Sequence, residues 1–132
     1  VAPAILSNQF ISMYKSSNAK KVILSVGSGA AQTAIGGWST YCSSKAGLDM
    51  LSKCIDEEHE DIISLSIAPG KVDTPMQNDI RFADEKAFPR LKEFQKYHKN
   101  GELIDPKEVA TTYKKILENP ENFLQLSHIT DI

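Results

Sequence analysis

The chain has 132 residues, of which 41% are hydrophobic and 24% are charged, with a formal net charge of −2 at pH 7. This balance is typical of one soluble globular domain and excludes an intrinsically disordered chain. The sequence has neither a basic stripe typical of nucleic-acid binding nor an apolar run long enough to span a membrane. Cys42 and Cys54 have no metal-ligand or disulfide spacing, which favours a reducing, cytoplasmic setting without a metal site.

The first predicted helix spans residues 3–16. Pro3 suits the first helical position, and apolar residues follow at helical spacing, namely Leu6, Phe10 and Met13. Residues 22–26 then form a short, mostly β-branched run that is bounded by Gly27 and Gly29. Such a run predicts a buried strand of the kind found in parallel sheets.

The second predicted helix, over residues 39–59, is apolar on two sides. One side carries Leu48, Leu51 and Ile55, and the other carries Ala46, Met50 and Cys54. A helix with two apolar sides is expected to be buried on both. We therefore expect one side to pack on a sheet and the other to pack on a partner subunit.

A second buried-type strand is predicted over residues 62–68, and Pro69-Gly70 terminates it. Residues 71–104 are predicted to be irregular or partly helical. Within them, apolar and aromatic residues recur every third position from Phe88 to Tyr97, which indicates an amphipathic helix.

The last predicted helix begins at Asp105, which is followed by Pro106 at the first helical position and Glu108 at the third. Asn119-Pro120 ends this helix. Residues 128–132 then predict a last, short strand.

The predicted order of elements is α-β-α-β-α-β. Strands that alternate with helices predict an α/β fold with a parallel sheet, in a single domain over residues 1–132. A sheet of three strands would leave two edges exposed, which is a liability for an isolated domain. We therefore expect further strands in a longer protein and interpret the chain as a partial domain.

Ser28, Tyr41 and Lys45 are the candidate catalytic residues. Ser28 lies just beyond the first strand, and ligand sites of open α/β sheets lie at the carboxyl ends of strands. Tyr41 and Lys45 are four positions apart on a helix and share one face. A nearby cation favours the phenolate form of tyrosine, so Lys45 would make Tyr41 an acid–base group while Ser28 holds a substrate oxygen. The same spacing also occurs by chance, as an exposed tyrosine beside a solvated lysine.

Four features in order resemble the short-chain dehydrogenase/reductase family. Residues 41–48 (Tyr-Cys-Ser-Ser-Lys-Ala-Gly-Leu) are similar to the family's Tyr-x-x-x-Lys signature followed by small residues. Ser28 stands 13 positions before Tyr41, where the family has its catalytic serine, and the strand at 22–26 precedes it. Residues 69–74 (Pro-Gly-Lys-Val-Asp-Thr) resemble the family's Pro-Gly-x-Val-x-Thr motif. The resemblance implies the C-terminal half of a Rossmann-like, doubly wound parallel sheet.

Within the family, three stretches are similar to the branch of sepiapterin reductase and the fungal benzil-type dicarbonyl reductases. These stretches are residues 37–42, 49–51 and 68–77. The likeness implies NADPH as the cofactor. It also implies a small-molecule carbonyl substrate, either a dicarbonyl or a pterin-like ketone.

The resemblance implies a role for each matching residue. Tyr41 is the general acid that protonates the carbonyl oxygen, Lys45 assists Tyr41 and binds the nicotinamide ribose, and Ser28 orients and polarises the carbonyl. The implied cofactor-binding residues are Tyr41, Lys45, Pro69, Gly70, Val72 and Thr74. The implied substrate-binding residues are Ser28, Trp38, Tyr41 and Met76, with residues 75–104 as the substrate-loop region.

The family's nucleotide-binding motifs are absent from this sequence. Neither the Gly-x-x-x-Gly-x-Gly turn nor the Asn-Asn-Ala-Gly motif is present, and the family's catalytic Asn would fall just before Val1. Gly27-x-Gly29 and Gly36-Gly37 do not open a helix as a phosphate site requires. The chain is therefore expected to lack the N-terminal nucleotide-binding strands.

Two functions remain open from the sequence. The first is an NADPH-dependent carbonyl reductase, a homodimer through the helices at 3–16 and 39–59, of which this chain is part. The second is a truncated, non-catalytic module for binding or oligomerisation. The missing cofactor motifs and the helix with two apolar sides favour the second function, because an exposed apolar face needs a partner.

Overall fold

The computed structural model describes residues 1–123 and 125–129, which form layers around a parallel sheet. The sheet has three strands, β1 (Lys21–Val26), β2 (Ile62–Ala68) and β3 (Leu126–His128), in the order β1-β2-β3. Both strand pairs are parallel, with Val26 opposite Ile67 in the first pair. The predicted α/β fold with a parallel sheet is therefore confirmed.

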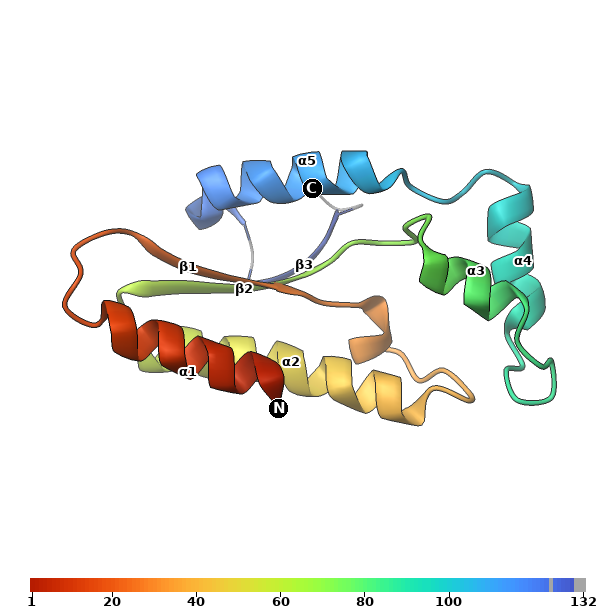
Figure 1. Ribbon diagram of the computed structural model, residues 1–132, viewed down its shortest axis with the longest axis horizontal. Coiled ribbons are helices and arrows are strands. Elements are labelled where there is room, and N and C mark those ends of the chain that lie inside the picture. Colours follow the sequence, from red (N-terminus) through yellow and green to blue (C-terminus); the bar gives the residue numbers. More distant parts are fainter. Residues whose placement is uncertain (124, 130–132) are drawn as a thin grey trace.

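Helices cover both faces of this sheet (Figure 1). Helices α1 (Ala2–Tyr14) and α2 (Ser39–Glu58) lie on one face, and α5 (Pro106–Glu118) lies on the other. Among the described helices, none combines the length and apolar character that crossing a membrane requires.

Side chains of the central strand β2 divide by chemistry between the two faces. Successive residues of a strand point to opposite sides. Leu65 and Ile67 form a core with Ile116 of α5. On the opposite face, the hydroxyl oxygen of Ser64 lies 2.9 Å from that of Ser52 on α2. The apolar core therefore lies between β2 and α5, and the α2 side of the sheet is partly polar.

Helix α2 meets the sheet through apolar and polar contacts together. Ile55 is buried, as its position in the predicted apolar stripe requires. The Asp56 carboxylate accepts a hydrogen bond from the Ser64 backbone N–H at 3.2 Å, which the hydrophobic pattern did not predict. Met50 and Cys54, on the second predicted apolar side, are exposed in the chain.

Between β2 and α5 the chain forms two short helices, α3 (Pro75–Arg81) and α4 (Leu91–Lys99). Both lie at the end of the sheet where β1 and β2 terminate (Figure 1). A second apolar cluster joins them to the rest of the fold, with Phe88, Leu91 and Phe94 at its centre. The predicted amphipathic helix is present as α4, but Phe88 lies in the turn before it.

Helix α5 begins as its sequence predicts. Asp105 is the N-cap, and its carboxylate accepts a hydrogen bond from the Lys107 backbone N–H at 2.7 Å. Further along, the Tyr113 hydroxyl donates to the Ile67 carbonyl oxygen at 2.6 Å. Burial raises the pKa of Tyr113 to about 12, so this hydroxyl keeps its proton at neutral pH.

The last strand differs from its prediction. Residues 128–132 were expected to form it, whereas β3 spans Leu126–His128 and shares only His128 with that range. Residues 130–132 lie outside the described residues. Pairing with β2, which aligns Ser127 with Ile67, determines this short strand more than its local pattern does.

Replacing Ile116 with alanine is expected to destabilise the fold. Ile116 is 0% exposed, and losing such a side chain costs about 2–5 kcal/mol of unfolding free energy, which urea denaturation measures. Leu117→Ala, at the neighbouring position that is 49% exposed, is the matched control and should cost less than about 1 kcal/mol. Equal losses in the two variants would contradict the assignment of the core.

Candidate functional site

Ser28 lies in the turn that follows β1. The backbone N–H of Gly27 donates to the Ile67 carbonyl oxygen at 2.8 Å, which continues the β1–β2 pairing to this point. Ser28 then caps the short 3-10 helix η1 (Gly29–Ala31), and its hydroxyl accepts a hydrogen bond from the Ala30 backbone N–H at 3.2 Å. The serine is thus held at the carboxyl end of a strand, where the sequence predicts a ligand site.

Tyr41 and Lys45 lie on the first turns of α2 and face the same side. The Lys45 ammonium nitrogen is 5.8 Å from the centroid of the Tyr41 ring. It also donates a hydrogen bond of 2.8 Å to the carbonyl oxygen of Val26, the last residue of β1. One lysine therefore contacts both the Tyr41 ring and the last residue of the strand that leads into Ser28.

Trp38 joins the start of α2 to the segment before α4. Its ring stacks on Phe88 with a centroid distance of 4.9 Å and an interplanar angle of 10°. It meets the Tyr41 ring edge-on at 5.2 Å and the Phe94 ring at 5.4 Å. Tyr41 is therefore bordered by an aromatic cluster in which Trp38 contacts the predicted aromatic stripe of residues 88–97, a contact that the sequence did not predict.

Gly37 allows two loops to approach each other beside this cluster. Its φ angle of 82° lies in the left-handed region, and a Cβ atom there would lie 2.4 Å from the Ala87 carbonyl oxygen. Only glycine tolerates both conditions without strain. The residues before α2 are thus locked to the residues before α4.

The predicted cofactor-binding loop follows β2 at the same end of the sheet. Gly70 has a φ of 77°, and Val72 forms a parallel bridge with Ile104. Thr74 is the N-cap residue of α3, and Met76 is exposed on that helix. The loop therefore has a fixed path from β2 to α3.

Charged groups fasten α4 to this loop. The Lys71 ammonium lies 3.6 Å from the centroid of the Tyr97 ring and forms an ion pair with Glu102 at 2.9 Å.

Hydrogen bonds from Arg90 and then from the Tyr97 hydroxyl lower the pKa of Glu93 to about 2. The carboxylate therefore stays ionised at neutral pH.

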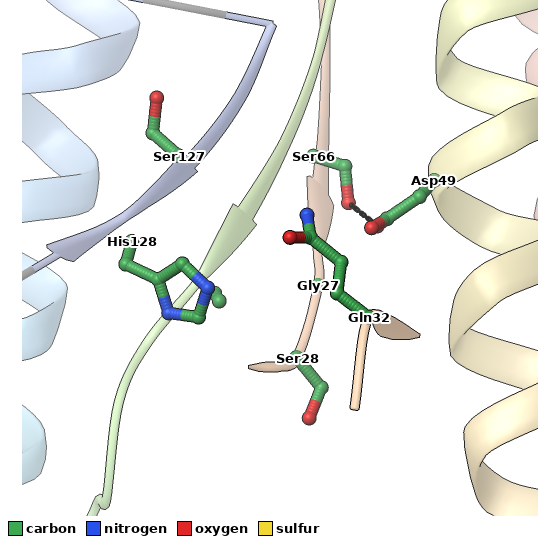
Figure 2. A pocket seen from close by; sticks show the side chains of 8 residues that line it. Gly27, Ser28, Gln32, Asp49, Ser66, Ser127 and His128 are labelled. Atoms are coloured by element: carbon green, nitrogen blue, oxygen red, sulfur yellow. Dashed lines mark hydrogen bonds between the residues drawn. The ribbon is translucent and has the colours of Figure 1, made fainter. Parts of the chain in front are cut away.

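A small pocket opens beside Ser28 (Figure 2). Its lining comes from the turn after β1, from the residue after η1, from α2 and from strands β2 and β3, and consists of Gly27, Ser28, Gln32, Asp49, Ser66, Ala68, Ser127 and His128. Inside it, the Ser66 hydroxyl donates to the Asp49 carboxylate at 2.7 Å. Within the described residues, no group of three His, Cys, Asp or Glu side chains could hold a metal ion.

Asp49 and His128 are neighbours of Ser28 that were not predicted from the sequence. Asp49 lies four positions after Lys45, so helical spacing could have placed it on the same face as Tyr41 and Lys45. His128 belongs to β3, whose position depends on strand pairing, and no local signal could have found it.

Known proteins are similar to this chain in sequence. A family model described as short chain dehydrogenase matches residues 2–85. A benzil reductase ((S)-benzoin forming) of Bacillus subtilis is 40% identical over 121 residues, covering 89% of this chain and 50% of that protein. A sepiapterin reductase of Xenopus tropicalis is 34% identical over 100 residues, covering 75% of this chain and 36% of that protein.

Two solved structures have the same fold. The KRED1-Pglu enzyme superposes with a TM-score of 0.80 at 34% identity, covering 92% of this chain and 51% of that one. The short chain dehydrogenase/reductase YIR035C from Saccharomyces cerevisiae superposes with a TM-score of 0.76 at 28% identity, covering 94% and 51%. The chain thus spans about half the length of the first curated relatives it matches.

Gly37→Ala is expected to separate the two loops that meet at Trp38. Forcing a Cβ into a left-handed conformation costs about 1–3 kcal/mol of unfolding free energy. Trp38 is the only tryptophan, so a red shift of the intrinsic fluorescence reports the loss of its stack on Phe88. Gly47→Ala is the control, since a Cβ there meets nothing within 4 Å, and its spectrum should not change. A Gly37→Ala protein with native fluorescence and stability would contradict this account.

Proposed function

Because this chain belongs to the short-chain dehydrogenase family, we propose that it carries the catalytic residues of an oxidoreductase that reduces a carbonyl to an alcohol. The proposed hydride donor is NADPH. The hydrogen bond from Lys45 to the Val26 carbonyl oxygen is the observation that carries the proposal, because it links Lys45, which lies beside the Tyr41 ring, to the strand that leads into Ser28.

The residues at this end suit a nicotinamide nucleotide. The Lys45 ammonium has three N–H donors and uses one on Val26, which leaves donors for a ribose hydroxyl. Gly70 has no side chain to obstruct a flat ring lying against the loop that it shares with Pro69 and Val72. Thr74 adds a hydroxyl at the end of this loop. When bound, the nucleotide supplies a hydride to the carbonyl carbon.

Tyr41 and Ser28 perform the remaining chemistry in this proposal. Both hydroxyls bind the carbonyl oxygen, and Ser28 polarises the C=O bond. As the carbon accepts the hydride, the Tyr41 hydroxyl donates its proton to the oxygen, which becomes the alcohol. Lys45 balances the negative charge that develops on Tyr41.

The proposed substrate is a dicarbonyl or a pterin-like ketone. The similarity to benzil reductases and sepiapterin reductases supports this choice. Trp38 and Met76 would border such a substrate, with residues 75–104 as its loop. The stack of Trp38 on Phe88 supplies an aromatic surface next to Tyr41, which suits a flat, conjugated carbonyl compound.

We also propose that the protein works as a cytoplasmic homodimer through α1 and α2. Leu6 and Met13 on α1 are 63% and 76% exposed, and Met50 on α2 is 57% exposed. Such apolar side chains need a partner surface. The same exposure supports the second candidate function, a non-catalytic binding or oligomerisation module.

Tyr41→Phe is expected to lower kcat for benzil reduction by roughly 10²–10⁴-fold, because the proton donor is lost. Steady-state kinetics with NADPH, on the full gene product that carries this chain, measures the loss. Tyr113→Phe removes a tyrosine hydroxyl on the far face of the sheet and should leave kcat unchanged. A wild-type protein that reduces neither diketones nor pterin-like carbonyls with NADPH or NADH would refute the proposed reductase activity. The non-catalytic binding or oligomerisation module would then be the remaining candidate function.

Leu6→Glu is expected to convert the dimer into a monomer, since a carboxylate would have to be desolvated at the interface. Sedimentation velocity at micromolar concentration measures the change. Phe82→Glu replaces an exposed aromatic side chain outside α1 and α2 and should leave the dimer intact. A monodisperse wild-type monomer would contradict both the dimer and the oligomerisation module.

A further inference from the structure

We propose that Asp49 is a positioning residue for the acid–base pair. Through its hydrogen bond with Ser66, Asp49 fixes the position of helix α2 along the strands of the sheet. This position determines how Tyr41 and Lys45 lie relative to the Ser28 turn. This inference rests on the proposed function, because it assigns Asp49 an effect on the rate of carbonyl reduction.

Asp49 continues the catalytic face of α2. Tyr41, Lys45 and Asp49 are spaced four residues apart, so they lie on one side of the helix in consecutive turns. Lys45 donates to the Val26 carbonyl oxygen of β1 at 2.8 Å. One turn later, Asp49 accepts from the Ser66 hydroxyl of β2 at 2.7 Å. Two directional hydrogen bonds to two neighbouring strands thus fix both the rotation of α2 about its axis and its position along the strands.

Ser66 links Asp49 to the backbone that carries Ser28. The Ser66 hydroxyl oxygen lies 2.8 Å from the position that a Cβ on Gly27 would occupy, so it fills the space that this glycine leaves open. Gly27 directly precedes Ser28, and Asp49 and Ser28 line the same pocket (Figure 2). One hydroxyl therefore contacts the catalytic helix on one side and the catalytic turn on the other.

Packing alone does not determine the position of α2 along the strands in this part of the sheet. Close to Asp49, the side chains on this face of β2 are those of Ser64, Ser66 and Ala68. All three are small, so their packing offers little resistance to sliding of α2 along the strand. Hydrogen bonds to a charged group are shorter, stronger and more directional than neutral ones. The bond to the Asp49 carboxylate therefore determines the register between Tyr41 and Ser28.

Asp56 provides a matched control on the same helix and the same strand. Its carboxylate accepts from the Ser64 backbone N–H at 3.2 Å, farther from Tyr41 along α2. Loss of this bond removes a comparable helix–strand contact. It leaves the Lys45 and Asp49 contacts beside the Ser28 turn in place.

The test compares Asp49→Ala, Asp49→Asn and Asp56→Ala in the full gene product, with benzil and NADPH as probes. We expect Asp49→Ala to lower kcat by roughly 10- to 100-fold, as a small misplacement of reacting groups does, with KM little changed. Asp49→Asn should recover most of the rate, because its amide oxygen still accepts from Ser66. Asp56→Ala should leave kcat unchanged even if thermal stability falls. Equal losses of kcat in Asp49→Ala and Asp56→Ala, or no loss in Asp49→Ala, would overturn the proposal.

Ser66→Ala keeps the test decisive if Asp49→Ala does not fold. It removes only the hydroxyl and should lower kcat to the same extent as Asp49→Ala. The double variant should show no further loss, since both substitutions break one interaction. Additive losses would show that Asp49 acts by another route and would overturn the proposal.

A structural readout separates this inference from the proposed activity. Crystal structures should show that the distance between the Ser28 and Tyr41 hydroxyl oxygens changes in Asp49→Ala and not in Asp56→Ala. This comparison remains decisive for the positioning role even if the wild-type protein reduces no carbonyl. An unchanged distance in Asp49→Ala would overturn the positioning role.

Discussion

The hydrogen bond from the Lys45 ammonium to the Val26 carbonyl oxygen is the interaction on which the candidate site depends. It connects the helix that carries Tyr41 to the strand that leads into Ser28, and it uses one of three lysine donors. The acceptor is the backbone carbonyl of Val26, the last residue of β1. The end of a parallel sheet thus provides an acceptor that holds a cation beside a phenol.

The two faces of β2 make different kinds of contact with the helices that cover them. On the far face, the apolar core of Leu65, Ile67 and Ile116 supplies stability and involves none of the candidate site residues. On the near face, serine hydroxyls and carboxylates form hydrogen bonds between α2 and β2. These bonds constrain the orientation of the helix, but they bury less apolar surface than aliphatic side chains would. The face of β2 that packs on α5 therefore contributes stability, and the face that packs on α2 positions that helix.

Local patterns predicted the elements that carry their own signals. The strand at 62–68 is bounded by Pro69-Gly70, and the helix after Asp105 has a complete capping pattern, so both lie where expected. Spacing and motif likeness also selected Ser28, Tyr41 and Lys45 as candidate catalytic residues, and this assignment stays a prediction. The partners of these residues were not predictable, because the Trp38–Phe88 stack and the Ser66–Asp49 bond join segments that only the folded chain brings together.

Transfer of label from NADPH to a carbonyl carbon tests the central claim most directly. The full gene product would be incubated with benzil and with NADPH deuterated at C4 of the nicotinamide on either face. The account predicts that one of the two labelled nucleotides yields an alcohol carrying one deuterium on the carbinol carbon, and that Lys45→Ala greatly slows its formation. An unlabelled product from both nucleotides, or no product from the folded wild-type protein, would contradict the claim that these residues serve nicotinamide-dependent carbonyl reduction.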